Sequence, residues 1–364
     1  MLYLLIGLIF IYILIINPKG NVFIKALFFG LLFGIIAYYF VPRGDYDLAR
    51  HHQYIKDFIN NDSLNFLRHR LVLHQYETIP TLYSYLIAKL NNVNLAQFFV
   101  VTLGYGTIYY LVADYSKKTN LNKIWYIPIM LFSVFGFYVL YFISGLYFYI
   151  GTILFALAFY LDYQKDTNKI LVYTLYVLTF FIHDAIFFPL MLLLLYKVFR
   201  NKMNIFTIMI ISILVFFSYS ILEYLANIDL LKFLKPIVKM YSSYISMGEN
   251  MNRLYRGNIL LIEVSKLVTT LFVTILMTKN KGNHKCYNYI YLLSFSSLFM
   301  LTKSIVMIRF CMLIQLLGIV PLIDYFNNKG NRNLKFIMFF YVLLFAMYYL
   351  IYFIVVLHGE SFYF

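Results

Sequence analysis

The chain has 364 residues, of which 63% are hydrophobic and only 12% are charged. No soluble domain can bury that much apolar surface, so the composition excludes a water-soluble globular protein. The formal net charge is +15. Most lysines stand in short connectors between apolar segments, where membrane topology explains them, so we expect no nucleic-acid partner.

Apolar segments suited to membrane helices recur along the whole chain. Backbone groups in lipid must be satisfied within a helix or a closed barrel, and these segments lack the two-residue alternation of barrel strands. Residues 2–16 have no preceding basic region and no small-residue cleavage site, so we expect a membrane helix there and no removable signal peptide. The predicted spans are 2–16, 26–41, 95–113, 124–143, 146–161, 169–182, 185–199, 205–223, 259–278, 286–302, 305–323 and 336–356.

These twelve spans predict an all-α integral membrane protein that forms a single polytopic domain over residues 1–364. The connectors that fall on one side carry basic residues, namely Lys19, Lys25, Lys117, Lys118, Lys123, Lys165, Lys169, Lys197, Arg200, Lys202, Lys279, Lys281, Lys285, Lys329, Arg332 and Lys335. By the positive-inside rule that side is cytoplasmic. Both termini and the two long connectors, 42–94 and 224–258, are then outside. Cys286 and Cys311 lack the spacing of a zinc site or a disulfide framework and are predicted to be packing residues.

Charged residues gather in the first outer connector. Asp47 to Ile59 has the spacing of an amphipathic helix, with Leu48, Ile55 and Ile59 on its apolar face. The neighbouring polar flank holds Asp47, Arg50, His51 and Tyr54. This pattern predicts a helix that lies at the membrane surface.

The same connector has the residue types of a site that combines a general base with an anion-binding group. Asp45 or Asp47 beside a histidine suits a general base. The arginines that suit an anionic group are Arg43, Arg50, Arg68 and Arg70. The alternative is a solvated loop with ordinary ion pairs. Asp45-Tyr46-Asp47 also has the form of a metal-binding triplet, but an outer site would not meet nucleotide sugars, so we expect no metal.

Glu77 precedes a short apolar segment that ends at Leu90. The segment is too short to cross a membrane and suits a re-entrant or interfacial position, with Glu77 at its mouth. The alternative is ordinary capping of a helix that starts near Pro80.

Further ionisable residues stand in apolar surroundings, where they are costly and are functional by default. His183 and Asp184 fall at a predicted outer turn, and the alternative for His183 is a helix cap. Arg309 lies inside span 305–323 and requires an anion, for which a substrate phosphate would serve. Arg253 and Arg256, in the second outer connector, suit lipid headgroups or substrate.

The order of these features resembles the EpsG family of bacterial exopolysaccharide polymerases, which is similar in role to the Wzy polymerases. The resemblance is carried by Asp45 to Tyr54, by Tyr76-Glu77-Thr78-Ile79-Pro80 leading into Leu82–Leu90, by Ile182-His183-Asp184-Ala185, and by Ile308-Arg309-Phe310 followed by Ile319-Val320-Pro321. One stretch departs from the family. Where such proteins often have an Arg-Gln pair before a small residue, this chain reads Gly145-Leu146-Tyr147-Phe148-Tyr149-Ile150-Gly151, so the arginine's role falls to Arg309 or Arg253 or is not needed.

The resemblance implies a fold similar to the GT-C membrane glycosyltransferases, with a long first outer loop. It implies polymerisation of undecaprenyl-pyrophosphate-linked repeat units at the outer face of the bacterial cytoplasmic membrane, without a metal or cofactor. The expected base is Asp45, Asp47 or His183. The expected substrate-binding residues are Arg43, Arg50, His51, Arg68, Arg70, Glu77, Asp184, Arg253, Arg256 and Arg309. The expected partners are the lipid-linked oligosaccharide, membrane lipid, and a chain-length regulator and flippase of the same pathway.

Three alternatives stay open. A lipid-linked-oligosaccharide flippase would distribute charges through the bilayer and would not gather them on one side. A glycan ligase would use the same donor and differ in its acceptor. A membrane acyltransferase would pair a catalytic histidine with an acid, as His183-Asp184 would allow.

Overall fold

The computed structural model describes residues 20–42, 47–61, 64–73, 78–137, 142–143, 145–165, 167–199, 205–217, 286–299, 304–328, 332–358 and 361–362, with a few isolated residues. Over these residues the fold is all-α, apart from one antiparallel pair of two-residue strands. The strands are β1 (Phe40–Val41) and β2 (Ser361–Phe362).

The chain divides into two compact units, which are described separately. The first unit consists of Met1–Phe187 and Leu322–Phe364, and the second of Phe188–Pro321. The expectation of a single membrane domain stays a prediction.

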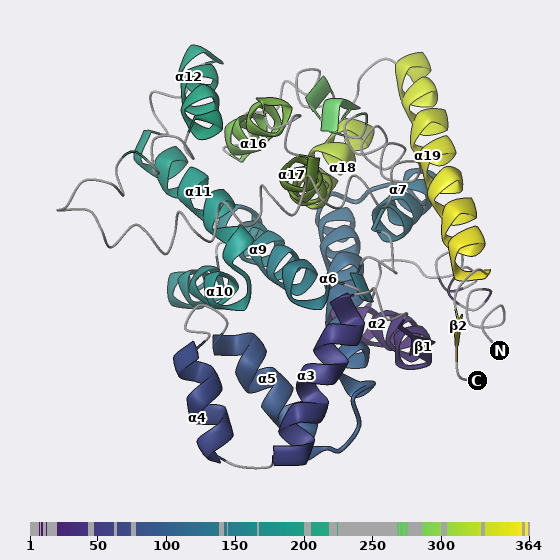
Figure 1. Cartoon of the computed structure of the whole chain (residues 1–364). Coiled ribbons are helices and arrows are strands. Elements are labelled where there is room, and N and C mark those ends of the chain that lie inside the picture. Colours follow the sequence, from purple (N-terminus) through teal and green to yellow (C-terminus); the bar gives the residue numbers. More distant parts are fainter. Residues whose placement is uncertain are drawn as a thin grey trace. The chain divides into compact units, whose positions relative to one another are not determined.

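The helices of the first unit fall mostly where the apolar periodicity predicts them (Figure 1). They are α2 (Val22–Tyr38), α3 (Asp47–Asn61), α4 (Leu64–Leu73), α5 (Thr78–Lys89), α6 (Leu95–Lys118), α7 (Lys123–Phe135), α9 (Leu146–Gln164), α10 (Lys169–Ile182), the 3₁₀ turn η2 (Asp184–Ile186) and α19 (Arg332–His358). The second unit contains most of α11 (Phe187–Phe199), and α12 (Ile205–Phe216), α16 (Tyr287–Phe299) and α17 (Ser304–Leu317). The division falls within α18 (Ile319–Asn327).

Three helices of the described part of the chain are long and apolar enough to cross a membrane. They are Leu95–Lys118, Leu146–Gln164 and Arg309–Asn327. These helices confirm the prediction of an all-α membrane protein, while the count of twelve spans stays a prediction. Other predicted spans hold shorter apolar helices, such as α2 with 17 residues and α10 with 14, where a span normally needs about 20. Spans 2–16 and 259–278 lie largely outside the described residues.

The packing of α2 against α6 depends on two glycines spaced four residues apart. A Cβ added at Gly30 would lie 2.1 Å from the carbonyl oxygen of Thr102, and one added at Gly34 would lie 2.0 Å from the Thr102 hydroxyl. Small residues at this spacing let two membrane helices approach closely. The pattern Gly30-x-x-x-Gly34 in the sequence therefore serves helix packing and does not mark a functional site.

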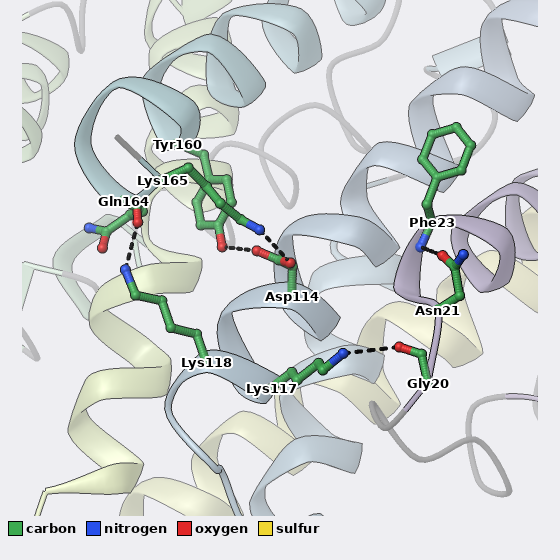
Figure 2. A network of polar contacts seen from close by, with 9 residues as sticks. All are labelled: Gly20, Asn21, Phe23, Asp114, Lys117, Lys118, Tyr160, Gln164 and Lys165. Carbon is green, nitrogen blue, oxygen red and sulfur yellow. Dashed lines mark hydrogen bonds and ion pairs between the residues drawn. The ribbon is translucent and has the colours of Figure 1, made fainter. Parts of the chain in front are cut away.

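Basic connector residues gather at one end of the first-unit helices, as Figure 2 shows. Lys117 donates a hydrogen bond to the Gly20 carbonyl (3.1 Å), and Lys118 donates to the Gln164 carbonyl (2.6 Å). Lys165 pairs with Asp114 at 2.8 Å. We call this the lysine end. It joins the last turns of α6 and α9 to the start of α2, as an alternating membrane topology predicts.

Candidate functional site

The predicted amphipathic helix is present as α3, but its buried face differs from the expected one. Leu48 and Ile55 are buried as predicted, and the face is completed by His52 and Phe58, while Ile59 is only half-buried. The side-chain amide oxygen of Gln97, Oε1, lies 2.8 Å from His52 Nε2. An amide oxygen can only accept, so the histidine nitrogen donates the hydrogen bond. The bond fixes α3 to the first turn of α6.

Helix α5 connects three other helices through side-chain hydroxyls. The Tyr83 hydroxyl donates to the Ala96 carbonyl (2.7 Å), which ties α5 to α6. The buried Thr81 hydroxyl lies 3.3 Å from that of Tyr54 on α3. The buried Ser84 hydroxyl lies 2.9 Å from that of Tyr147 on α9. In Figure 1, α3, α4 and α5 accordingly lie together as one group.

Four polar residues from separate segments meet where α6 and α9 begin. The His51 and Tyr147 rings pack edge to face with centroids 4.6 Å apart, and Tyr147 bonds Ser84. His183, just after α10, packs against Phe148, the neighbour of Tyr147 on α9, with ring centroids 5.5 Å apart. We call His51, Ser84, Tyr147 and His183 the histidine cluster. It lies at the opposite end of α6 and α9 from the lysine end.

Both histidines of the cluster are suited to act as neutral hydrogen-bonding groups. Burial, together with the neighbouring Arg50, His52 and His183, lowers the pKa of His51 to about 4. The Ala185 N–H donates to His183 Nδ1 (3.1 Å), so a neutral His183 carries its proton on Nε2. This arrangement makes His183 a hydrogen-bond donor, and its expected role as the base stays a prediction.

The lowered pKa of His51 has a consequence for stability. Since the folded protein disfavours the charged imidazole, the unfolded chain binds more protons between pH 6.5 and about 4. The free energy of unfolding therefore falls as the pH falls through this window. Burial also lowers the pKa of His52, which acts in the same direction.

The arginines of the first connector occupy different environments. Arg50 is exposed and pairs with Asp47, one turn away. Arg70 lies over the rings of Tyr54 (5.0 Å) and Phe66 (5.1 Å), and its guanidinium is 3.7 Å from the Asp57 carboxylate. Arg70 thus joins α4 to α3. Arg68, on the same helix, is exposed. The described residues do not bring these arginines together around one anion.

Other predicted site residues are less fully placed. Arg43, Asp45, Glu77, Arg253 and Arg256 lie outside the described residues, and for Asp184 only the backbone, in η2, is described. Arg309 is half-buried on α17 of the second unit. Within the described ranges no group of three or more His, Cys, Asp or Glu side chains is placed to hold a metal. Cys286 and Cys311 are both buried, and no disulfide joins them.

Ser84 and Tyr147 were not predicted as site residues. Ser84 lies in the apolar segment after Glu77, and nothing in its spacing marks it. Tyr147 lies in Gly145–Gly151, the stretch that departs from the family pattern, and this departure is the feature of the sequence that could have pointed to Tyr147.

Comparison with protein-family models, curated proteins and solved structures gives no match to this chain. The family resemblance therefore rests on its four motifs and stays a prediction.

We expect His51 to remain uncharged at pH values that protonate an ordinary histidine. Diethyl pyrocarbonate reacts with neutral imidazole, so an unstructured histidine peptide with a pKa near 6.5 loses about tenfold in rate between pH 7.5 and 5.5. His51 should keep its rate over this range, because its pKa is about 4. Mass spectrometry of modified peptides measures both rates. A parallel fall in the His51 rate would show that the imidazole is not buried as described.

Proposed function

We propose that this protein is a membrane glycosyltransferase that polymerises undecaprenyl-pyrophosphate-linked repeat units at the outer face of the bacterial cytoplasmic membrane. The observation that carries the proposal is the histidine cluster, which assembles from four separate segments at the end of α9 opposite the lysine end. If the lysine end is cytoplasmic by the positive-inside rule, the cluster faces outward. The twelve-span, GT-C-like architecture belongs to the same proposal.

The residues suit a glycosyl transfer without a metal. An acceptor hydroxyl of the new repeat unit attacks the anomeric carbon of the donor, and its proton passes to a carboxylate, Asp45 or Asp47. The bond from that carbon to the pyrophosphate oxygen breaks, and undecaprenyl pyrophosphate leaves with the electron pair. Guanidinium groups of the first connector meet the developing charge. Those proposed are Arg43, Arg68 and Arg50, which pairs with Asp47, whereas Arg70 lies against Tyr54 and Asp57.

In this scheme His51 and His183 hold sugar hydroxyls. A neutral His51 imidazole offers one donor and one acceptor, which matches a hydroxyl group, and His183 offers the donor at Nε2 because its Nδ1 accepts from Ala185. A charged imidazole would instead attract the pyrophosphate. The lowered pKa of His51 therefore favours an acceptor-sugar position for the histidine cluster.

The test is polymerisation by purified protein in detergent. A synthetic undecaprenyl-pyrophosphate repeat unit from the protein's own pathway is incubated with EDTA, and the products are separated on a gel. We expect a ladder that Asp47→Ala lowers at least tenfold, while His69→Ala, an exposed change on α4, leaves it intact. Unchanged substrate with well-folded protein would contradict the proposal and favour a flippase, which a liposome translocation assay would detect. Transfer of a single unit to another acceptor would favour a ligase.

A further inference from the structure

Tyr147 is held from three directions in the histidine cluster. Its hydroxyl is hydrogen-bonded to Ser84, whose side chain is fully buried. Its ring meets His51 at 4.6 Å between centroids, with the ring planes at 75°. On another side it meets the Tyr83 ring at 6.3 Å and 90°. The Tyr83 hydroxyl donates a hydrogen bond to the Ala96 carbonyl, so the ring that meets Tyr147 is held between α5 and α6.

These contacts give Tyr147 one favoured orientation. Edge-to-face aromatic pairs have a preferred geometry, and the buried Ser84 hydroxyl is costly to leave without its partner. A phenylalanine would fill the same volume without the directional bond. The hydroxyl pair therefore fixes the position of the ring that packs against His51, as well as joining α5 to α9.

Gly151 lets helix α9 pass close to the turn that carries His183. A Cβ there would lie 3.2 Å from Ile186 and 3.7 Å from the Cβ of His183. The first turns of α9 consequently run next to the turn that carries His183. The same short stretch of α9 thus contacts both histidines, with Tyr147 against His51 and Phe148 against His183.

We propose that Ser84 and Tyr147 are positioning residues, in which the Ser84–Tyr147 hydrogen bond fixes the tyrosine ring and this ring orients the His51 imidazole toward the acceptor sugar. The inference rests on the proposed function for the identity of the sugar. The orientation of His51 by Tyr147 does not depend on it. Ser84 and Tyr147 act only through His51 and touch no reacting atom.

The experiment measures His51 directly and activity separately. Ser84→Ala and Tyr147→Phe each remove one hydroxyl, and Ser84→Thr restores one. Thr81→Val is the matched control, because it removes the other hydroxyl bond that α5 makes to a tyrosine. The first readout is the rate at which diethyl pyrocarbonate modifies His51 in each full-length protein. The second is the kcat and KM of polymerisation with the lipid-linked repeat unit.

We expect Ser84→Ala and Tyr147→Phe to raise the His51 modification rate severalfold and to lower kcat about tenfold with KM unchanged, since one buried hydrogen bond is lost. The double variant should be no worse than either single variant, because both remove the same bond. Ser84→Thr should retain the parent values, and Thr81→Val should leave the His51 rate unchanged. Equal His51 rates in parent, Ser84→Ala and Tyr147→Phe would overturn the inference. A responsive His51 in a protein without polymerase activity would uphold the contact and overturn the proposed function.

Discussion

Replacing Gly30 by valine should prevent α2 from packing against α6 and leave little folded protein. The new Cβ would lie 2.1 Å from the Thr102 carbonyl oxygen and 3.0 Å from the Gly106 nitrogen. Both are backbone atoms of α6, so neither can rotate away. Overpacking usually costs 1–3 kcal/mol, and a clash with fixed backbone should cost about 3 kcal/mol or more. Thermal unfolding in detergent and the yield of monodisperse protein measure the effect.

Two further variants test whether the effect at Gly30 comes from the close approach of α2 to α6. At Gly34 the nearest atom is the Thr102 hydroxyl, a side-chain group that can turn, so Gly34→Ala should destabilise less than Gly30→Ala. Gly7→Val adds the same side chain where no atom of the described residues lies within 4 Å of the added Cβ. A Gly30→Val protein that unfolds at the temperature of the parent and of Gly7→Val would show that α2 and α6 do not approach this closely.

Replacing Asp114 by alanine should loosen the lysine end (Figure 2). Asp114 accepts a hydrogen bond from the buried Tyr160 hydroxyl (2.5 Å) and pairs with Lys165. Loss of the carboxylate leaves the tyrosine hydroxyl without this acceptor, which costs about 1–3 kcal/mol. The ion pair adds little, because one-third of the Lys165 side chain is exposed. We expect a total loss of about 2–3 kcal/mol in the free energy of unfolding.

The Asp114 prediction has an internal check and a defined pH dependence. In a Tyr160→Phe background the cost of Asp114→Ala should shrink, because the hydroxyl that needed the acceptor is gone. Burial lowers the pKa of Lys165, but Asp114 and Tyr110 outweigh it and the pKa is raised. A raised lysine pKa contributes stability that is full below its ordinary value of 10.5 and is lost only above it. The cost should therefore be equal at pH 6 and pH 8, and a cost that vanished at either pH would refute this account.

Local patterns predicted the helices well because periodicity and start signals are local. The segment 169–182 is helical over the predicted range, and Asn168 caps it by accepting a hydrogen bond from the Ile170 N–H. The prediction for the apolar face of α3 did not include His52. This histidine is buried and hydrogen-bonded to Gln97, a partner 45 positions away. Long-range pairing of this kind has no signature in the spacing of residues.

The candidate site illustrates the same limit. The polar flank of α3 identified His51, and the apolar setting of His183 identified the second histidine. Arg70 was predicted to bind a substrate anion, and this stays a prediction; the structure places its guanidinium over the rings of Tyr54 and Phe66 and near the Asp57 carboxylate of α3. Ser84 and Tyr147 are ordinary residues of apolar helices, and only the meeting of α5 with α9 gives them a role.

The first unit is closed by chain that follows the second unit in sequence. Trp125 on α7 stacks on Phe326 at 5.0 Å and also meets Phe336 and Phe339 of α19, while β1 pairs with β2. A ribosome must therefore complete residues 188–321 before these partners exist. During synthesis Trp125 therefore meets these rings only after the chain of the second unit has been made, so the first unit begins the sequence and is completed last.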